Sequence, residues 1–106
     1  MISLEEFKKV ELKVGKIVEV KNHPNADKLY VLTIDLGSEK RTVVAGLRQY
    51  YKPEELLNKL VVLITNLEPK KLRGVESQGM ILAAEKDGKV SLVTVDREIK
   101  PGARVF

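Results

Sequence analysis

Leu29-Tyr30-Val31-Leu32-Thr33-Ile34-Asp35-Leu36, followed by Gly37-Ser38 and then Arg41-Thr42-Val43-Val44-Ala45, is the stretch that decides the fold. Both segments are rich in the β-branched and large apolar residues that favour extended structure. Gly37 and Ser38 between them predict a tight turn of the kind that joins two antiparallel strands. The sequence therefore predicts a β-hairpin at residues 29–45.

A further strand is predicted upstream of this hairpin. Leu12, Val14, Val18 and Val20 recur at even positions with charged residues between them, which is the periodicity of a strand with one buried face. Gly15 and the apolar Ile17 disturb the alternation and predict a bulge.

Short helices and further strands complete the pattern. Ser3 and Glu6 form a capping-box signature for a helix over residues 4–9, and Pro53 opens a second helix over 53–57. Strands are predicted at 60–67, 80–84 and 90–95, the last two around an Asp87-Gly88 turn. This order predicts an all-β domain of five or six strands on an OB-like plan. The fold class expected is a five-stranded OB-fold barrel with short helices and a C-terminal extension.

Composition limits the function. The 106 residues predict one domain over 1–106, and 19 basic minus 15 acidic residues leave a net charge of +4, a mild preference for polyanions. The absence of Cys removes thiol chemistry, and the lone His23 in a loop is expected to face solvent or to structure that loop. No nucleophile, metal or cofactor motif is complete, and no apolar run suits a membrane span. We expect a non-catalytic cytoplasmic protein with no cofactor.

The most concentrated charge is Lys70-Lys71-Leu72-Arg73, predicted as a flexible basic loop. Such a loop can follow a phosphate backbone, although a solvated charged loop without a partner remains an alternative. Only five aromatic residues are present, too few for a platform that stacks successive bases. A folded RNA read through its shape and phosphates fits this composition better than a single strand.

Three blocks of sequence resemble the tRNA-binding domain superfamily. They are His23-Pro24-Asn25-Ala26-Asp27-Lys28-Leu29, Val44-Ala45-Gly46-Leu47, and the long block from Asn66 to Met80 with its Ser77-Gln78-Gly79-Met80 end. The tail from Val95 to Gly102 resembles the C-terminal tRNA-binding domain of methionyl-tRNA synthetases, which in some organisms is a separate β subunit. Ala45 departs from the family pattern, in which Ser is common.

The resemblance implies an OB fold, tRNA as partner, a homodimer, and association with a catalytic synthetase subunit. Carried over residue by residue, it implies a tRNA-facing surface made of Asn25, Lys28, Arg41, Lys70, Lys71, Arg73, Ser77 and Met80. Core filling is the alternative for Met80, and turn geometry for Gly74 and Gly79. The superfamily also contains an export-related, peptide-binding chaperone, which is the second functional hypothesis.

A dimer interface is expected where apolar residues gather near the two chain ends. Phe7, Ile99, Val105 and Phe106 are the candidates, because apolar residues on a surface commonly mark a contact with another chain. The alternative is that they close the open ends of the barrel.

Overall fold

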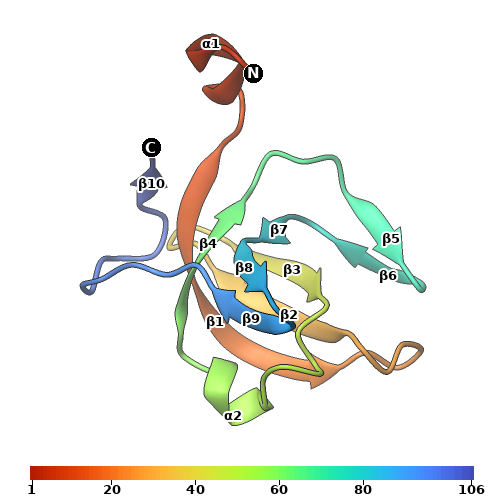
Figure 1. Cartoon of the computed structure of the whole chain (residues 1–106). Helices are drawn as coiled ribbons and strands as arrows, with labels where there is room; N and C mark the ends of the chain where they lie inside the picture. The colour runs from red at the N-terminus through yellow and green to blue at the C-terminus, as the bar shows by residue number, and fades with distance from the viewer.

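A curved antiparallel sheet forms the body of the molecule (Figure 1). The computed structural model describes residues 1–106. The strands along the sheet follow the order β3-β2-β1-β4-β7, and β10 pairs with the start of β1. Their bounds are β1 Leu12–Asn22, β2 Tyr30–Asp35, β3 Lys40–Ala45, β4 Leu60–Ile64, β7 Met80–Ile81 and β10 Arg104–Val105. The predicted all-β, OB-like barrel is confirmed.

Two small hairpins and two short helices complete the chain. Strands β5 Lys70–Leu72 and β6 Val75–Ser77 form one hairpin, and β8 Ala83–Lys86 and β9 Lys89–Leu92 form the other. The helices are α1 Leu4–Phe7 and α2 Pro53–Leu56, neither of which is long and apolar enough to cross a membrane. The Asp87-Gly88 turn is confirmed, with both residues at positive φ as a type I′ turn requires.

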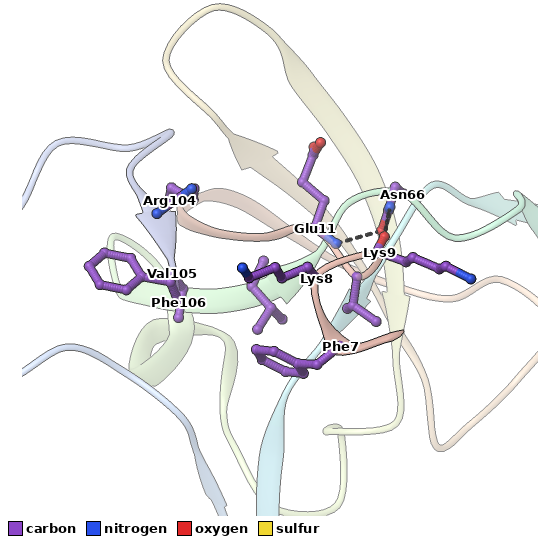
Figure 2. Close-up of a pocket in the computed structure, with 10 residues that line it drawn as sticks. Phe7, Lys8, Lys9, Glu11, Asn66, Arg104, Val105 and Phe106 are labelled. Atoms are coloured by element: carbon purple, nitrogen blue, oxygen red, sulfur yellow. Dashed lines mark hydrogen bonds between the residues drawn. The ribbon is translucent and has the colours of Figure 1, made fainter. Parts of the chain in front are cut away.

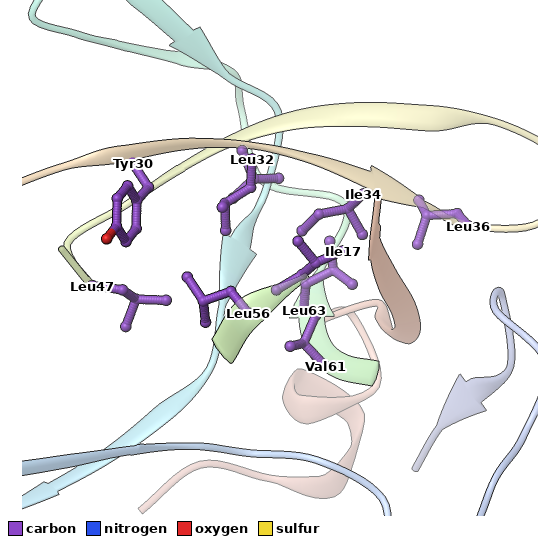
Figure 3. Close-up of a cluster of buried hydrophobic side chains, with 10 residues drawn as sticks. Ile17, Tyr30, Leu32, Ile34, Leu36, Leu47, Leu56, Val61 and Leu63 are labelled. Atoms are coloured by element: carbon purple, nitrogen blue, oxygen red, sulfur yellow. The ribbon is translucent and has the colours of Figure 1, made fainter. Parts of the chain in front are cut away.

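The core lies inside the curve of the sheet (Figure 3). Alternate residues of β2, including Leu32 and Ile34, point inward and meet Ile17 of β1 and Leu63 of β4, while Leu56 of α2 covers them. The completely buried residues are Ile17, Leu32, Ile34, Val43, Leu56, Val61 and Leu63. Burial alternates with period two in β2, as the sequence predicts. In β1 the predicted even positions are not the buried face, since Ile17 is fully buried and Val18 only partly, and β3 and β4 each bury consecutive residues.

Gly15 has a packing role rather than a place in the bulge. A Cβ there would lie 2.4 Å from Cγ2 of Ile34 and 3.0 Å from Cδ2 of Leu63, so only glycine lets β1 approach the core this closely. The register between β1 and β2 shifts between Ile17 and Glu19, just beyond the predicted position.

The predicted strand over 60–67 ends early, at Ile64. Beyond it the side chains turn toward the start of β1: Asn66 Oδ1 accepts a hydrogen bond from the Glu11 amide at 2.8 Å, and its Nδ2 donates to the Lys9 carbonyl at 2.6 Å. The first helix also ends early, at Phe7, although Ser3 Oγ caps it by accepting from the Glu6 amide. Helix α1 stands clear of the barrel (Figure 1).

The predicted basic loop at 70–73 is also different, because residues 70–72 form strand β5. Lys70 pairs with Ser77, and Leu72 pairs with Val75. The sequence does not reveal this strand, because a hairpin that projects into solvent carries charged residues and lacks the alternation of apolar residues by which strands are recognised.

Glu11 links the start of β1 to the end of β4 and carries a pH dependence. A hydrogen bond from the Thr65 hydroxyl at 2.5 Å, and then the nearby Lys13 ammonium, hold the pKa of its carboxyl below its ordinary value of 4.5. A lowered pKa stabilises the fold above the unfolded-state pKa, and that stabilisation is lost as pH falls through the folded-state pKa.

Glu11→Gln should therefore flatten the acid side of the stability profile. We expect urea unfolding of the wild type to lose free energy below pH 4.5 more steeply than unfolding of the variant, with the two curves parallel above that pH. Glu5→Gln, on exposed helix α1, is the control and should leave the slope unchanged. Equal slopes in all three proteins below pH 4.5 would contradict the role of Glu11.

Candidate nucleic-acid interface

The β5–β6 hairpin projects from the barrel and carries three of the predicted cations (Figure 1). Its turn is Arg73-Gly74, with φ of 54° and 91°, the left-handed conformations that a two-residue hairpin turn needs. Lys70, Lys71 and Arg73 are all exposed, and Glu76 lies opposite Lys71 in the register. The hairpin gives these cations a defined backbone, which a flexible loop would not.

His23 holds this hairpin against the loop that precedes β2. Its side chain is only 3% exposed, Nε2 lies 2.8 Å from the Leu72 carbonyl oxygen, and Nδ1 accepts from the Asn25 amide at 3.0 Å. These partners assign the neutral tautomer in which Nε2–H donates to the carbonyl. Of the two roles expected for His23, the loop-structuring role is the one observed.

Asn25 and Lys28 lie on the same loop, beside the hairpin turn. The Asn25 side-chain nitrogen donates to the Arg73 carbonyl at 3.4 Å. The Lys28 carbonyl accepts from the Arg48 amide at 3.4 Å, which places the backbone of a further basic residue next to Lys28. Lys28, Arg48, Lys70, Lys71 and Arg73 are called the basic surface below. Sequence reasoning missed Arg48, because it is an isolated basic residue outside any basic run.

Arg41 lies at the opposite end of β3 from Ala45, at the base of the hairpin, where it lines a hollow with Pro69 and Gln78. Its guanidinium forms an ion pair with Glu39 at 2.9 Å and donates to the carbonyls of Thr65 and Gln78. The structure thus does not bring Arg41 together with Asn25 and Arg73. Its position fits a structural role, joining β3 to the segment that follows β4.

Ser77 and Gln78 hold the outer edge of β3. The Ser77 side chain is 5% exposed, and its hydroxyl accepts from the Val44 amide at 2.9 Å and donates to the Gly79 carbonyl at 3.1 Å. Gln78 accepts from the Thr42 amide through Oε1 at 3.2 Å and returns its own amide to the Thr42 carbonyl at 2.8 Å. The buried Ser77 hydroxyl is therefore committed within the chain.

Met80 lies on the surface, so the core-filling alternative does not describe it. The side chain is 46% exposed and lines an apolar groove of about 420 Å³ with Val44, Leu47 and Tyr50. Gly79, immediately before it, has φ of 153°, and a Cβ there would lie 2.9 Å from the Ile64 carbonyl oxygen. Gly79 is thus required because the chain there passes close to the Ile64 carbonyl, whereas Gly74 is required for the positive φ of the β5–β6 turn.

Three of the four candidate interface residues share a second groove, of about 500 Å³. Phe7 comes from α1, and Val105 and Phe106 come from the C-terminal end (Figure 2). Phe106 is 92% exposed, so it does not close the barrel. Ile99 lines a different hollow, beside Lys16 and Pro101.

Residues 12–104 match a family model described as "Putative tRNA binding domain". The chain belongs to the tRNA-binding domain family. It is 66% identical over 104 residues to the methionine–tRNA ligase of Pyrococcus furiosus, and the match covers 98% of this chain and 14% of that ligase. The chain thus corresponds to about one seventh of that relative.

Two solved structures are similar over the whole chain. The MetRS-related protein from Pyrococcus horikoshii has a TM-score of 0.94 and 42% identity, and the match covers 100% of this chain and 98% of that one. The chaperone CsaA from Picrophilus torridus has a TM-score of 0.93 and 31% identity, with 100% of both chains covered. The same fold is therefore found both in a MetRS-related protein and in a chaperone.

The burial of Ser77 predicts the effect of its loss. Ser77→Ala leaves the Val44 amide without a partner, which should cost about 1–3 kcal/mol of unfolding free energy by urea titration. Faster hydrogen exchange at the Val44 amide should accompany that loss. Ser91→Ala, on exposed strand β9, is the control and should change neither. If Ser77→Ala keeps full stability but weakens RNA binding, the hydroxyl contacts RNA directly and the positioning role is wrong.

Proposed function

We propose that this chain is a non-catalytic module that binds folded tRNA through its basic surface and serves the catalytic region of a methionyl-tRNA synthetase. The observation that carries the proposal is the fixed β5–β6 hairpin, whose exposed cations stand beside Asn25 and Lys28. Membership of the tRNA-binding domain family and the likeness to a methionine–tRNA ligase support the same reading.

In this mechanism Lys28, Lys70, Lys71 and Arg73 contact phosphates of the tRNA backbone. Each contact releases a counterion, so affinity should fall steeply with salt. Such contacts position an RNA without reading its bases, which suits recognition of the shape that tRNAs share. Asn25 adds a polar contact beside the turn, and Met80 adds an apolar one.

Binding of this kind assists catalysis without performing it. A module that holds tRNA next to a catalytic region turns a second encounter into a local one, at an effective concentration far above that of free tRNA. The active-site residues then belong to the catalytic region, and the present chain supplies affinity.

The likeness to the chaperone CsaA supports a second candidate function, the binding of unfolded polypeptide. The apolar grooves are the features that a peptide would use. We rank it second because the hairpin cations offer nothing specific to an uncharged polypeptide.

Arg73→Ala provides the sharpest test of the primary proposal. In filter binding, the wild type should prefer folded tRNA over an unfolded polypeptide at moderate salt. The variant should weaken binding of all tRNAs alike and reduce the slope of log affinity against log salt by about 1, because one phosphate contact is lost.

Arg97→Ala is the matched control. Arg97 is also an exposed cation, and its one ion pair is with the exposed Asp96. It belongs to the segment between β9 and β10, which lies on the opposite side of the molecule from the hairpin (Figure 1). It should leave the slope unchanged. A wild type that prefers unfolded polypeptide would refute tRNA binding, and an unchanged slope in Arg73→Ala would place Arg73 away from phosphate.

We also propose that the chain forms a homodimer through the groove lined by Phe7, Val105 and Phe106. Exposed aromatic side chains from both ends of the chain make an apolar surface that a second copy would cover. Arg104 lies over the Phe106 ring, with the guanidinium carbon 4.9 Å from its centroid, and would rim the contact. Ile99 would contribute only if the interface extends to the neighbouring hollow.

Sedimentation over a dilution series tests the dimer. The wild type should sediment as a dimer at micromolar concentration, and Phe106→Ser should shift the transition to at least tenfold higher concentration. Tyr50→Ser, which removes an exposed aromatic ring from the other groove, should leave it unchanged. A monomeric wild type at micromolar concentration would overturn the dimer.

A further inference from the structure

The groove around Met80 is lined mainly by apolar residues, which take no part in the proposed contacts with phosphates. The apolar lining includes Ala45, Leu47 and Val90, and the exposed residues Tyr50, Met80 and Glu85 also line the groove. Tyr50 is 43% exposed, so its side chain is accessible to a ligand. The volume of about 420 Å³ falls in the range of roughly 300–1,000 Å³ that is usual for sites of small organic groups.

We propose that this groove holds one unpaired nucleobase of the bound tRNA, between the Tyr50 ring and the Met80 thioether. The inference rests on the proposed tRNA binding and adds to it a contact with a base. Aromatic rings bind bases of any identity by stacking, and a thioether adapts to a flat π face.

The segment from Leu47 to Tyr50 connects the groove to the basic surface along the chain. Leu47 and Tyr50 line the groove, while Arg48 between them donates its amide to the carbonyl of Lys28. Because Arg48 lies in sequence between two residues that line the groove, an RNA whose backbone lies on Lys28 and Arg48 would run close to it. Backbone phosphates would remain on the cations, and a base turned out of its stack would face the apolar walls.

Glu85 indicates which part of a nucleotide enters. A carboxylate repels a phosphate, so the phosphate is excluded from the groove. The same carboxylate accepts hydrogen bonds from exocyclic amino groups, as acidic side chains do with cytosine. Glu85 thus favours the entry of a nucleobase over that of the phosphate backbone.

The neighbouring tyrosine explains why one base fits and a strand of bases does not. The Tyr51 hydroxyl accepts from the Leu92 amide at 3.1 Å, and its carbonyl accepts from the Tyr30 hydroxyl at 2.7 Å. Tyr51 is thereby tied into the barrel, and Tyr50 is left as the aromatic ring of this groove. A single ring provides one stacking position.

An extended peptide is a poorer occupant. Peptides commonly bind beside a sheet by adding a strand to a free edge. Beside this groove the edge amides of β3 at Thr42 and Val44 are already bound by Gln78 and Ser77. A peptide could offer side chains to the groove but would find these two amides of β3 already occupied.

The chain contains two methionines, Met1 and Met80, which makes the test direct. Protein labelled with ¹³C at the methionine methyl groups gives two signals, of which that of Met1, an exposed residue that does not line the groove, is the control. Addition of folded tRNA at low salt should move the Met80 signal upfield through the ring current of a stacked base and leave Met1 in place.

Variants of Tyr50 supply the second measurement. Tyr50→Ala should lower tRNA affinity about tenfold, a typical effect of losing one stacked base, with an unchanged salt slope. Tyr50→Phe keeps the ring and should keep the affinity. Circular dichroism of both variants checks that they fold, and the exposed position of Tyr50 makes them well tolerated.

Three results would overturn the inference. If tRNA binds with the predicted salt slope while Met80 does not move and Tyr50→Ala is neutral, the nucleobase site is wrong and the proposed function stands. If unfolded polypeptide moves Met80 and tRNA does not, the groove is a peptide site. If tRNA does not bind the wild type at all, the proposed function fails, and the nucleobase site fails with it.

Discussion

Between β3 and β6–β7 the barrel has no continuous ladder of backbone hydrogen bonds, and the side chains of Ser77 and Gln78 take its place. They bind the amides of Val44 and Thr42, which would otherwise be an open sheet edge, and the Gln78 amide completes the contact by donating to Thr42. An open edge invites pairing with other chains, so closure by side chains protects the fold as well as holding it. Residue 79, which follows Gln78, has no room for a side chain, since a Cβ on Gly79 would lie 2.9 Å from the Ile64 carbonyl oxygen. One short segment therefore fixes the distance between the two ends of the sheet.

The same segment determines where the two candidate contact regions lie. Ser77 ends β6, the second strand of the basic hairpin, and Met80 begins β7 at the rim of the apolar groove. Because the residues between them are bound to β3, hairpin and groove are held in one arrangement before any partner arrives. His23 adds a second attachment by bonding the Leu72 carbonyl. A surface ordered in advance loses less conformational entropy on binding than a flexible loop would, which is the advantage of a β-hairpin for displaying cations.

Local pattern was enough to predict β2, because its alternating apolar residues report directly on which face is buried. It also located β1 but not the buried face of that strand, since Ile17 is fully buried and Val18 only partly. It missed β5 altogether. It failed where the deciding contacts join distant residues. Ser77 looked like a polar surface residue between glycines, yet its partner is Val44, 33 positions earlier. His23 is buried and contacts the Leu72 carbonyl, 49 positions later. Arg41 forms an ion pair with Glu39 and donates a hydrogen bond to the Thr65 carbonyl. A sequence motif shows that such residues belong together, but only the fold distinguishes a residue that touches a ligand from one that positions its neighbours.

The distribution of charge follows the same logic. The net charge of +4 is small, and the ion pairs Lys13–Glu11, Lys21–Glu19, Arg41–Glu39 and Arg97–Asp96 all lie outside the basic surface. At physiological ionic strength the screening length is about 8 Å, so a cation helps to hold a phosphate only when it stands near that phosphate. Cations scattered over the barrel therefore add little, whatever their total. Those of the β5–β6 hairpin and of the loop beside it are held together by the side chains of His23 and Asn25, which contact the carbonyls of Leu72 and Arg73. A folded polyanion of matching shape can recognise their fixed spacing.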